Sequence, residues 1–169
     1  MSSKVYIIGD SLLKGLPEEG KRYKTLCYRG LRTERLQGKI IRGVFDGELD
    51  GNSSAVIFVG TNNLKSESSK TIASDLLNLA SLLRSRYRGI AIKLCTLLPR
   101  TDKVWLNDKC KLTNKALKKL CVENKVELIE THKAFLKAKQ IKVHLLGEDG
   151  LHLTHSGSLA LQRSILDKV

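Results

Sequence analysis

Five short apolar segments recur along the chain and predict buried strands. They are Val5 to Ile8, Ala55 to Val59, Ile90 to Leu94, Val126 to Ile129 and, more weakly, Lys24 to Tyr28. Runs of this length without polar alternation are typical of parallel strands that are covered on both faces. The pattern therefore predicts a five-stranded parallel sheet.

Segments with the spacing of amphipathic helices lie between and after these strands. Apolar residues recur every three or four positions in residues 36–44, 72–83 and 112–121, with charged residues among them. A fourth such segment, residues 159–166, follows the helix-start signals Thr154 and Ser156. Strands that alternate with helices predict βαβ units, and hence an α/β fold with three layers, a parallel sheet sandwiched between helices.

The composition predicts one folded domain without a membrane span. A length of 169 residues suits a single domain over residues 1–169, and the hydrophobic content of 41% excludes general disorder. No apolar run approaches the ~20 residues that cross a bilayer. Met1 to Lys4 lead straight into an apolar run, without the hydrophobic region of a secretory signal. We therefore expect a cytoplasmic location.

The cysteines do not form a recognisable pattern of metal ligands or disulfides. Cys27, Cys95, Cys110 and Cys121 are widely spaced, and they form no C-x-x-C pair and no zinc-finger interval with histidine. We expect them to be reduced and mostly buried.

The charge of the chain points to an anionic partner. Thirty Lys and Arg against 17 Asp and Glu give a formal net charge of +13, with clusters in residues 14–42 and 133–142. A field of this size attracts nucleic acid or an anionic membrane surface. Because lysine-rich surfaces also promote solubility, the charge alone leaves this partnership open.

Candidate catalytic residues follow the predicted strands, and the carboxyl ends of parallel strands share one edge of the sheet. The first strand leads into Gly9-Asp10-Ser11, the second into Gly30, and the third into Gly60-Thr61-Asn62. Asp149 and His152 lie three positions apart near the end of the chain. A serine, an imidazole and a carboxylate are the parts of a serine acyl-transfer site.

Each of these residues has a role that chemistry requires. Ser11, at the start of a helix predicted near Leu12, would be the nucleophile, His152 the general base, and Asp149 the group that orients the imidazole. The helix dipole would favour the developing negative charge. The N–H groups of Ser11 and Gly30 and the Asn62 amide would stabilise the oxyanion.

Structural roles compete with these chemical ones. Asp10 and Ser11 are both good helix caps, and Asn62 and Asp149 suit turns. His155 is a second candidate base, whereas we interpret His132 and His144 as structural or solvated.

Taken together, the blocks Gly9-Asp10-Ser11-Leu12, Gly30, Gly60-Thr61-Asn62 and Asp149-x-x-His152 resemble those of the SGNH (GDSL-type) hydrolase family. The resemblance spans residues 5 to 161 and selects His152 over His155 as the base. It implies a flavodoxin-like parallel sheet and ester hydrolysis without a metal or other cofactor. The interval of 19 residues between Ser11 and Gly30 is short for this family, which makes Gly30 the weakest match.

The sequence therefore predicts a serine esterase that hydrolyses short-chain, acetyl-type esters, with lipid esters among the candidates. The alternative is a basic module that binds nucleic acid or anionic lipid and carries an accessory or inactive hydrolase site. The basic, compact chain also resembles the esterase domain in the first-reading-frame protein of some vertebrate LINE-type retrotransposons. In that case it would be excised from a longer protein.

Overall fold

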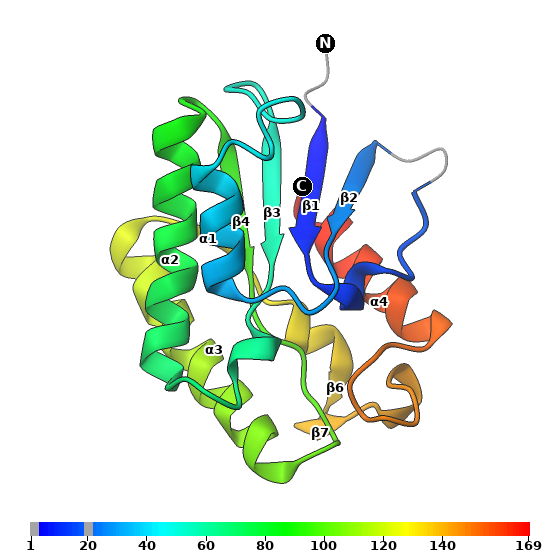
Figure 1. Ribbon diagram of the computed structural model, residues 1–169. Coiled ribbons are helices and arrows are strands. Elements are labelled where there is room, and N and C mark those ends of the chain that lie inside the picture. The colour runs from blue at the N-terminus through cyan, green and yellow to red at the C-terminus, as the bar shows by residue number, and fades with distance from the viewer. Residues whose placement is uncertain (1–3, 19–21) are drawn as a thin grey trace.

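The computed structural model describes residues 4–18 and 22–169 and contains a five-stranded parallel sheet in the order β2-β1-β3-β4-β5 (Figure 1). The order and direction of the strands confirm the predicted flavodoxin-like topology. All five predicted strands are present within two residues of their expected bounds. They are β1 (Val5–Gly9), β2 (Tyr23–Cys27), β3 (Ser54–Phe58), β4 (Ala91–Cys95) and β5 (Glu127–Ile129).

The four predicted helices are also present, and local signals explain their ends. Ser68 accepts a hydrogen bond from the Thr71 N–H at the start of α2, and Thr154 accepts one from the Gly157 N–H at the start of α4. The first helix begins and ends three residues earlier than the predicted segment 36–44, and it ends there because Gly43, with φ +76°, follows its last turn. The helices are α1 (Thr33–Ile41), α2 (Ser69–Arg86), α3 (Val104–Asn124) and α4 (His155–Leu166).

Shorter elements connect the strands to the helices. Four 3₁₀ turns are η1 (Ser11–Leu13), η2 (Thr61–Asn63), η3 (Thr131–Phe135) and η4 (Val143–Leu145), and a small hairpin is formed by β6 (Leu136–Lys137) and β7 (Gln140–Ile141). Within the described residues, none of the helices is both long and apolar enough to cross a membrane.

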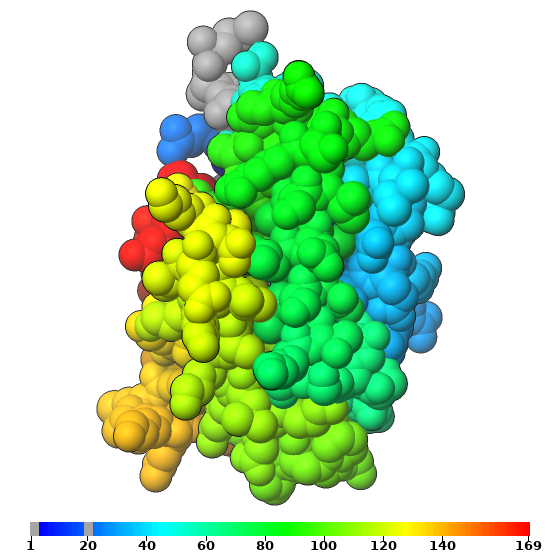
Figure 2. Space-filling model, turned by 90° about the vertical axis from the view of Figure 1, so that its left-hand side faces the viewer, coloured from blue at the N-terminus to red at the C-terminus, as the bar shows by residue number. Residues whose placement is uncertain are grey.

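The two faces of the sheet are covered by different elements. Alternate residues such as Ile8 and Ile57 pack under α1, α2 and α3, and Figure 2 shows α2 and α3 side by side over this face. Ile7, Val56 and Phe58 on the other face pack against α4 and the 3₁₀ turns. Because side chains alternate along each strand, the two faces form separate hydrophobic clusters.

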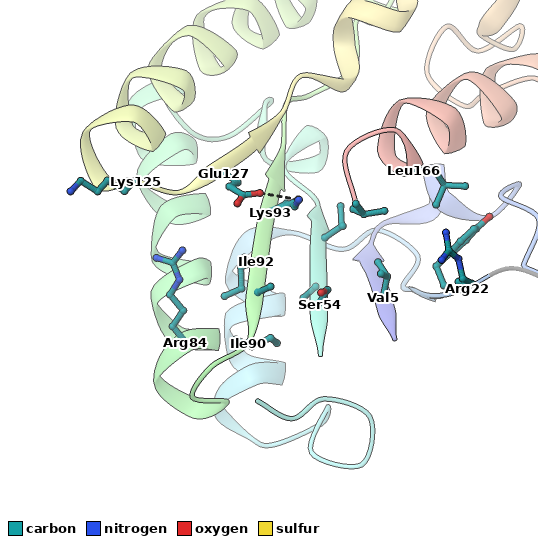
Figure 3. Close-up of a pocket in the computed structure, with 15 residues that line it drawn as sticks. Val5, Arg22, Ser54, Arg84, Ile90, Ile92, Lys93, Lys125, Glu127 and Leu166 are labelled. Carbon is teal, nitrogen blue, oxygen red and sulfur yellow. Dashed lines mark ion pairs between the residues drawn. The ribbon is translucent and has the colours of Figure 1, made fainter. Parts of the chain in front are cut away.

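The second face is covered less completely than the apolar runs predicted. At the amino ends of the strands it borders a hollow of about 630 Å³ (Figure 3). Lys93 of β4 forms an ion pair there with Glu127 of β5, at 2.9 Å. These two polar residues lie in segments that we predicted to be continuously apolar, and they explain why this corner of the sheet tolerates solvent.

All four cysteines are free thiols. Cys95, Cys110 and Cys121 are buried and Cys27 is exposed, which agrees with the expectation of mostly buried, reduced residues. Burial raises the pKa of the Cys110 thiol to about 12.

Candidate active site

The carboxyl ends of the strands gather the residues that the sequence singled out. Ser11, Gly30, Asn62 and His152 line a cleft of about 200 Å³ at this edge, and Asp149 contacts His152. The larger hollow of Figure 3 contains none of these residues and lies at the opposite edge of the sheet. The smaller cleft is therefore the candidate active site.

Ser11, His152 and Asp149 form a continuous chain of polar contacts. The Ser11 Oγ atom lies 3.3 Å from Nε2 of His152, although the residues are 141 positions apart in the sequence. On the other side of the ring, Nδ1 of His152 lies 2.5 Å from Oδ2 of Asp149. This arrangement can pass a proton from a hydroxyl to an imidazole whose far nitrogen is held by a carboxylate.

The loop before α4 fixes Asp149 under the imidazole. Oδ1 of Asp149 accepts the N–H groups of Leu151 and His152, both at 2.9 Å, so that each carboxylate oxygen has a partner. Gly150 between them has φ +70°, and a Cβ there would lie 2.6 Å from the Asp102 nitrogen. The hydrogen bond from His152, followed by that from the Leu151 N–H, lowers the pKa of Asp149 to about 2.

Asp10, rather than Ser11, caps the turn after β1. Its Oδ1 accepts the Leu12 N–H at 2.9 Å, which leaves the Ser11 hydroxyl free to face His152. The turn is the three-residue η1 and not the longer helix predicted near Leu12. The dipole argument was therefore wrong, because so short a turn has almost no macrodipole.

The amide of Asn62 is oriented by the loop that carries Gly30. Its Nδ2 donates to the carbonyl of Leu31 at 2.9 Å, and the second hydrogen of this nitrogen remains available. The structural role that we considered for Asn62 belongs to its neighbour: Asn63 is fully buried and contacts Thr33. The two adjacent asparagines therefore have different roles in the structure.

Gly30 reaches the cleft and has a backbone conformation that favours glycine. A Cβ at this position would meet no protein atom within 4 Å. Its φ is +67°, since the turn from Tyr28 to Leu31 needs a left-handed residue there. Within residues 4–18 and 22–169, the N–H groups of Ser11 and Gly30 donate to no protein acceptor.

A sequence profile of the GDSL-like Lipase/Acylhydrolase family matches residues 7–160. The chain belongs to this family. The predicted membership is therefore confirmed, and the chain is a GDSL-type hydrolase. No curated protein matches it closely enough in sequence to count as a relative.

Solved structures share the fold over nearly the whole hydrolase. A member of the lipolytic protein G-D-S-L family from Veillonella parvula is 15% identical, with a TM-score of 0.81 over 98% of this chain and 97% of that one. The acetyl xylan esterase AlAXEase is 18% identical, with a TM-score of 0.78 over 98% and 99%. The lipase/acylhydrolase from Enterococcus faecalis is also 18% identical, with a TM-score of 0.74 over 98% and 94%.

Two arginines that the sequence analysis did not select hold the Asn62 loop of the hydrolase. Arg32 donates to the carbonyl of Asn62 at 2.7 Å, and Arg100 donates to that of Thr61 at 3.1 Å. Arg100 is only 5% exposed and is paired with Asp102 through two nitrogens. Both are ordinary loop arginines in the sequence, so that only the contacts reveal this positioning role.

The other histidines lie outside the chain of contacts around Ser11. His155 is the exposed first residue of α4, as predicted. His132 Nδ1 contacts the Thr96 hydroxyl at 2.7 Å, and burial lowers the pKa of its imidazole. The carbonyl of His144 accepts the Thr154 hydroxyl at 2.9 Å. The Thr96 contact agrees with a structural role for His132, and the exposure of His144 agrees with a solvated side chain.

Asp10 carries an energetic cost at this edge of the sheet. It is 1% exposed, and among the described residues its Oδ2 has no hydrogen-bond partner. Burial raises the pKa of this carboxyl to about 7, against the opposing effects of the Leu12 N–H and of His152. Above pH 7 the fold therefore contains a buried, half-paired carboxylate.

Asp10→Asn is expected to become more stable relative to the wild type as the pH rises. The carboxyl of the folded protein keeps its proton up to about pH 7, whereas in the unfolded chain it loses its proton near the ordinary pKa of 3.8. Wild-type stability therefore falls as the pH rises from 3.8 to about 7. An asparagine can still accept the Leu12 N–H and does not ionise. Urea unfolding should show the variant gaining about 2–3 kcal/mol over the wild type between pH 5 and pH 8.

The exposed Asp167→Asn serves as the control and should show no comparable gain. An equal response of both variants would mean that Asp10 is not the group that limits stability at high pH.

Proposed function

We propose that this GDSL-type hydrolase is a serine esterase of short-chain carboxylic esters. The observation that carries the proposal is the contact chain from Ser11 through His152 to Asp149, at 3.3 and 2.5 Å. In this proposal Ser11 is the nucleophile, His152 is the general base and Asp149 orients the imidazole.

The reaction proceeds in two balanced steps. Ser11 Oγ attacks the acyl carbon while its proton passes to Nε2 of His152, and this proton then leaves with the alcohol as the ester C–O bond breaks. A water molecule gives a proton to His152 and attacks the acyl-enzyme. His152 then returns this proton to Ser11 Oγ as the bond between Oγ and the acyl carbon breaks, so that the carboxylic acid departs and the hydroxyl of Ser11 is restored. Asp149 remains ionised throughout and stabilises the imidazolium.

Three donors are assigned to the oxyanion. Among the residues that the structure describes, the N–H groups of Ser11 and Gly30 have no protein acceptor, and the Nδ2 of Asn62 has one hydrogen left after its bond to Leu31. Such donors act because they already point at the place where negative charge develops. The Arg32 and Arg100 contacts hold the Asn62 loop in this position.

The dimensions of the cleft favour short acyl groups. Its volume of about 200 Å³ is below the ~300–1,000 Å³ of sites that enclose drug-sized ligands. With 4-nitrophenyl esters, kcat/KM is expected to fall by about tenfold or more from acetate to decanoate, because a long chain finds no enclosed apolar surface. A rise with chain length would contradict the proposed acyl preference.

A direct test is covalent labelling of the active serine. A fluorophosphonate probe should modify the folded protein at Ser11, and peptide mass spectrometry should locate the adduct on that residue. The labelled protein should lose hydrolysis of 4-nitrophenyl acetate in proportion to the adduct. Labelling elsewhere, or full activity of the labelled protein, would overturn the proposed function.

The net charge of +13 supports a second role for the surface in binding an anionic membrane or a nucleic acid. Lys111 and Lys115 lie exposed along α3, with exposed Leu112 and Val122 near them. This role, the cytoplasmic location and the resemblance to a retrotransposon esterase domain remain predictions from the sequence.

A further inference from the structure

The cleft of the proposed esterase is lined by a cation, Arg29, that has no partner among the described residues. Arg29 lines the cleft together with Ser11, Gly30 and His152, and its side chain is exposed. It occupies the position before Gly30 in the turn from Tyr28 to Leu31, next to a proposed oxyanion donor. A group held by Arg29 would therefore lie in the same cleft as the reacting carbonyl.

Arg32, in the same loop, has a structural role, and its contacts can be compared with those of Arg29. Its guanidinium donates to the Asn62 carbonyl at 2.7 Å and to the Ser66 hydroxyl at 2.8 Å, and it also forms an ion pair with Glu34. Arg29, by contrast, makes no hydrogen bond or ion pair with any residue in the described part of the chain. Its guanidinium is available to a ligand.

The acidic residues nearby are engaged elsewhere and do not pair with Arg29. Asp149 is bound to the His152 imidazole and to two backbone N–H groups. Asp10 is 1% exposed and turns one carboxylate oxygen to the Leu12 N–H. Among the residues that line the cleft, Arg29 is therefore the cation offered to a substrate, on a protein whose overall charge of +13 attracts anions.

We propose that Arg29 forms an anion subsite, and that the preferred substrates are esters with a carboxylate or phosphate group close to the scissile bond. A guanidinium suits these groups because its planar fork donates two parallel hydrogen bonds to them. This inference rests on the proposed esterase function and specifies its substrate class. The anion can belong to the acyl part or to the alcohol part of the ester, and the two cases are separated by experiment.

The experiment compares anionic esters with neutral analogues of the same shape. The acyl arm uses mono-4-nitrophenyl glutarate and its terminal carboxamide, and the alcohol arm uses 4-acetoxybenzoate and 4-acetoxybenzamide. In at least one arm, wild-type kcat/KM should favour the anion by about tenfold, as expected for one charge-assisted hydrogen bond. Arg29→Gln should abolish the preference through KM, and Arg29→Lys should retain part of it.

Arg35→Gln is the matched control. It removes the same charge from an exposed position on α1 and should leave the preference intact. If Arg29→Gln and Arg35→Gln reduce the preference equally, the effect is long-range attraction and the subsite is wrong. The absence of any preference in both arms overturns it as well.

Binding to the Ser11→Ala protein separates this inference from the esterase function. Calorimetry on that variant should show the same preference for the anionic ester, and the preference should be lost in Ser11→Ala/Arg29→Gln. Equal dissociation constants for the anionic and neutral esters would overturn the subsite, whatever the activity of the wild type. Failure of the wild type to hydrolyse any of the esters would instead overturn the proposed function.

Discussion

Ser11→Ala is expected to lower kcat for 4-nitrophenyl acetate by on the order of 10⁴-fold or more. Without the hydroxyl no acyl-enzyme can form, and the remaining hydrolysis would rely on the oxyanion donors and on water. The fold should survive, because Asp10 and not Ser11 caps the turn after β1. Steady-state kinetics with a thermal melt of each protein measures both expectations.

Ser85→Ala is the matched control, since Ser85 lies on the exposed side of α2 away from the cleft. It should keep the wild-type kcat. Comparable rates for Ser11→Ala and the wild type would remove Ser11 from the mechanism and leave the cleft without a nucleophile.

His152→Ala is expected to reduce kcat by a similar factor, on the order of 10⁴. Its imidazole is the group that contacts Ser11 Oγ, and a serine hydroxyl is a weak nucleophile without a base. The double variant Ser11→Ala/His152→Ala should be scarcely slower than either single one, because residues that act as a unit are not additive. Kinetics of the three variants with one ester tests both statements.

His155→Ala provides the comparison that decides between the two candidate bases. His155 is the exposed first residue of α4, and the Ser11 hydroxyl contacts His152 instead. Its loss should change kcat by less than about threefold, because His155 lies outside the chain of contacts from Ser11 to Asp149. If His155→Ala were the more damaging change, the assignment of the base would have to be reversed.

Local sequence signals predicted most of the fold. The apolar runs gave the five strands, because a strand that is buried on both faces must be apolar at nearly every position. Thr154 predicted where α4 begins, since a side-chain oxygen satisfies a free N–H at a helix start. The prediction failed where local structure depends on contacts with other segments. A helix was predicted near Leu12, but η1 ends after three residues. Lys93, in a strand predicted to be buried on both faces, borders a hollow instead of packed side chains.

The candidate site was predicted only as a set of residues. Ser11, Gly30, Asn62, Asp149 and His152 were chosen from motifs and from their place after predicted strands, and the structure brings all of them to one edge. Their division of labour was not accessible in this way. That Asp10 and not Ser11 caps the turn is seen in a local contact with Leu12, and both residues are good caps by sequence. That Asn63 takes the structural role beside Asn62 follows from its contact with Thr33, which is 30 positions away.

The sequence by itself determined the α/β class, the strand positions and the residue types available for chemistry, because these depend on local spacing and hydrophobic pattern. Only the tertiary structure decided that Ser11 and His152 touch across 141 positions, that Arg32 and Arg100 fix the Asn62 loop, and that Arg29 lines the cleft. The physical reason is that hydrogen bonds and ion pairs act over a few ångströms in space. Which side chains come that close is set by packing of the whole chain and not by their order along it.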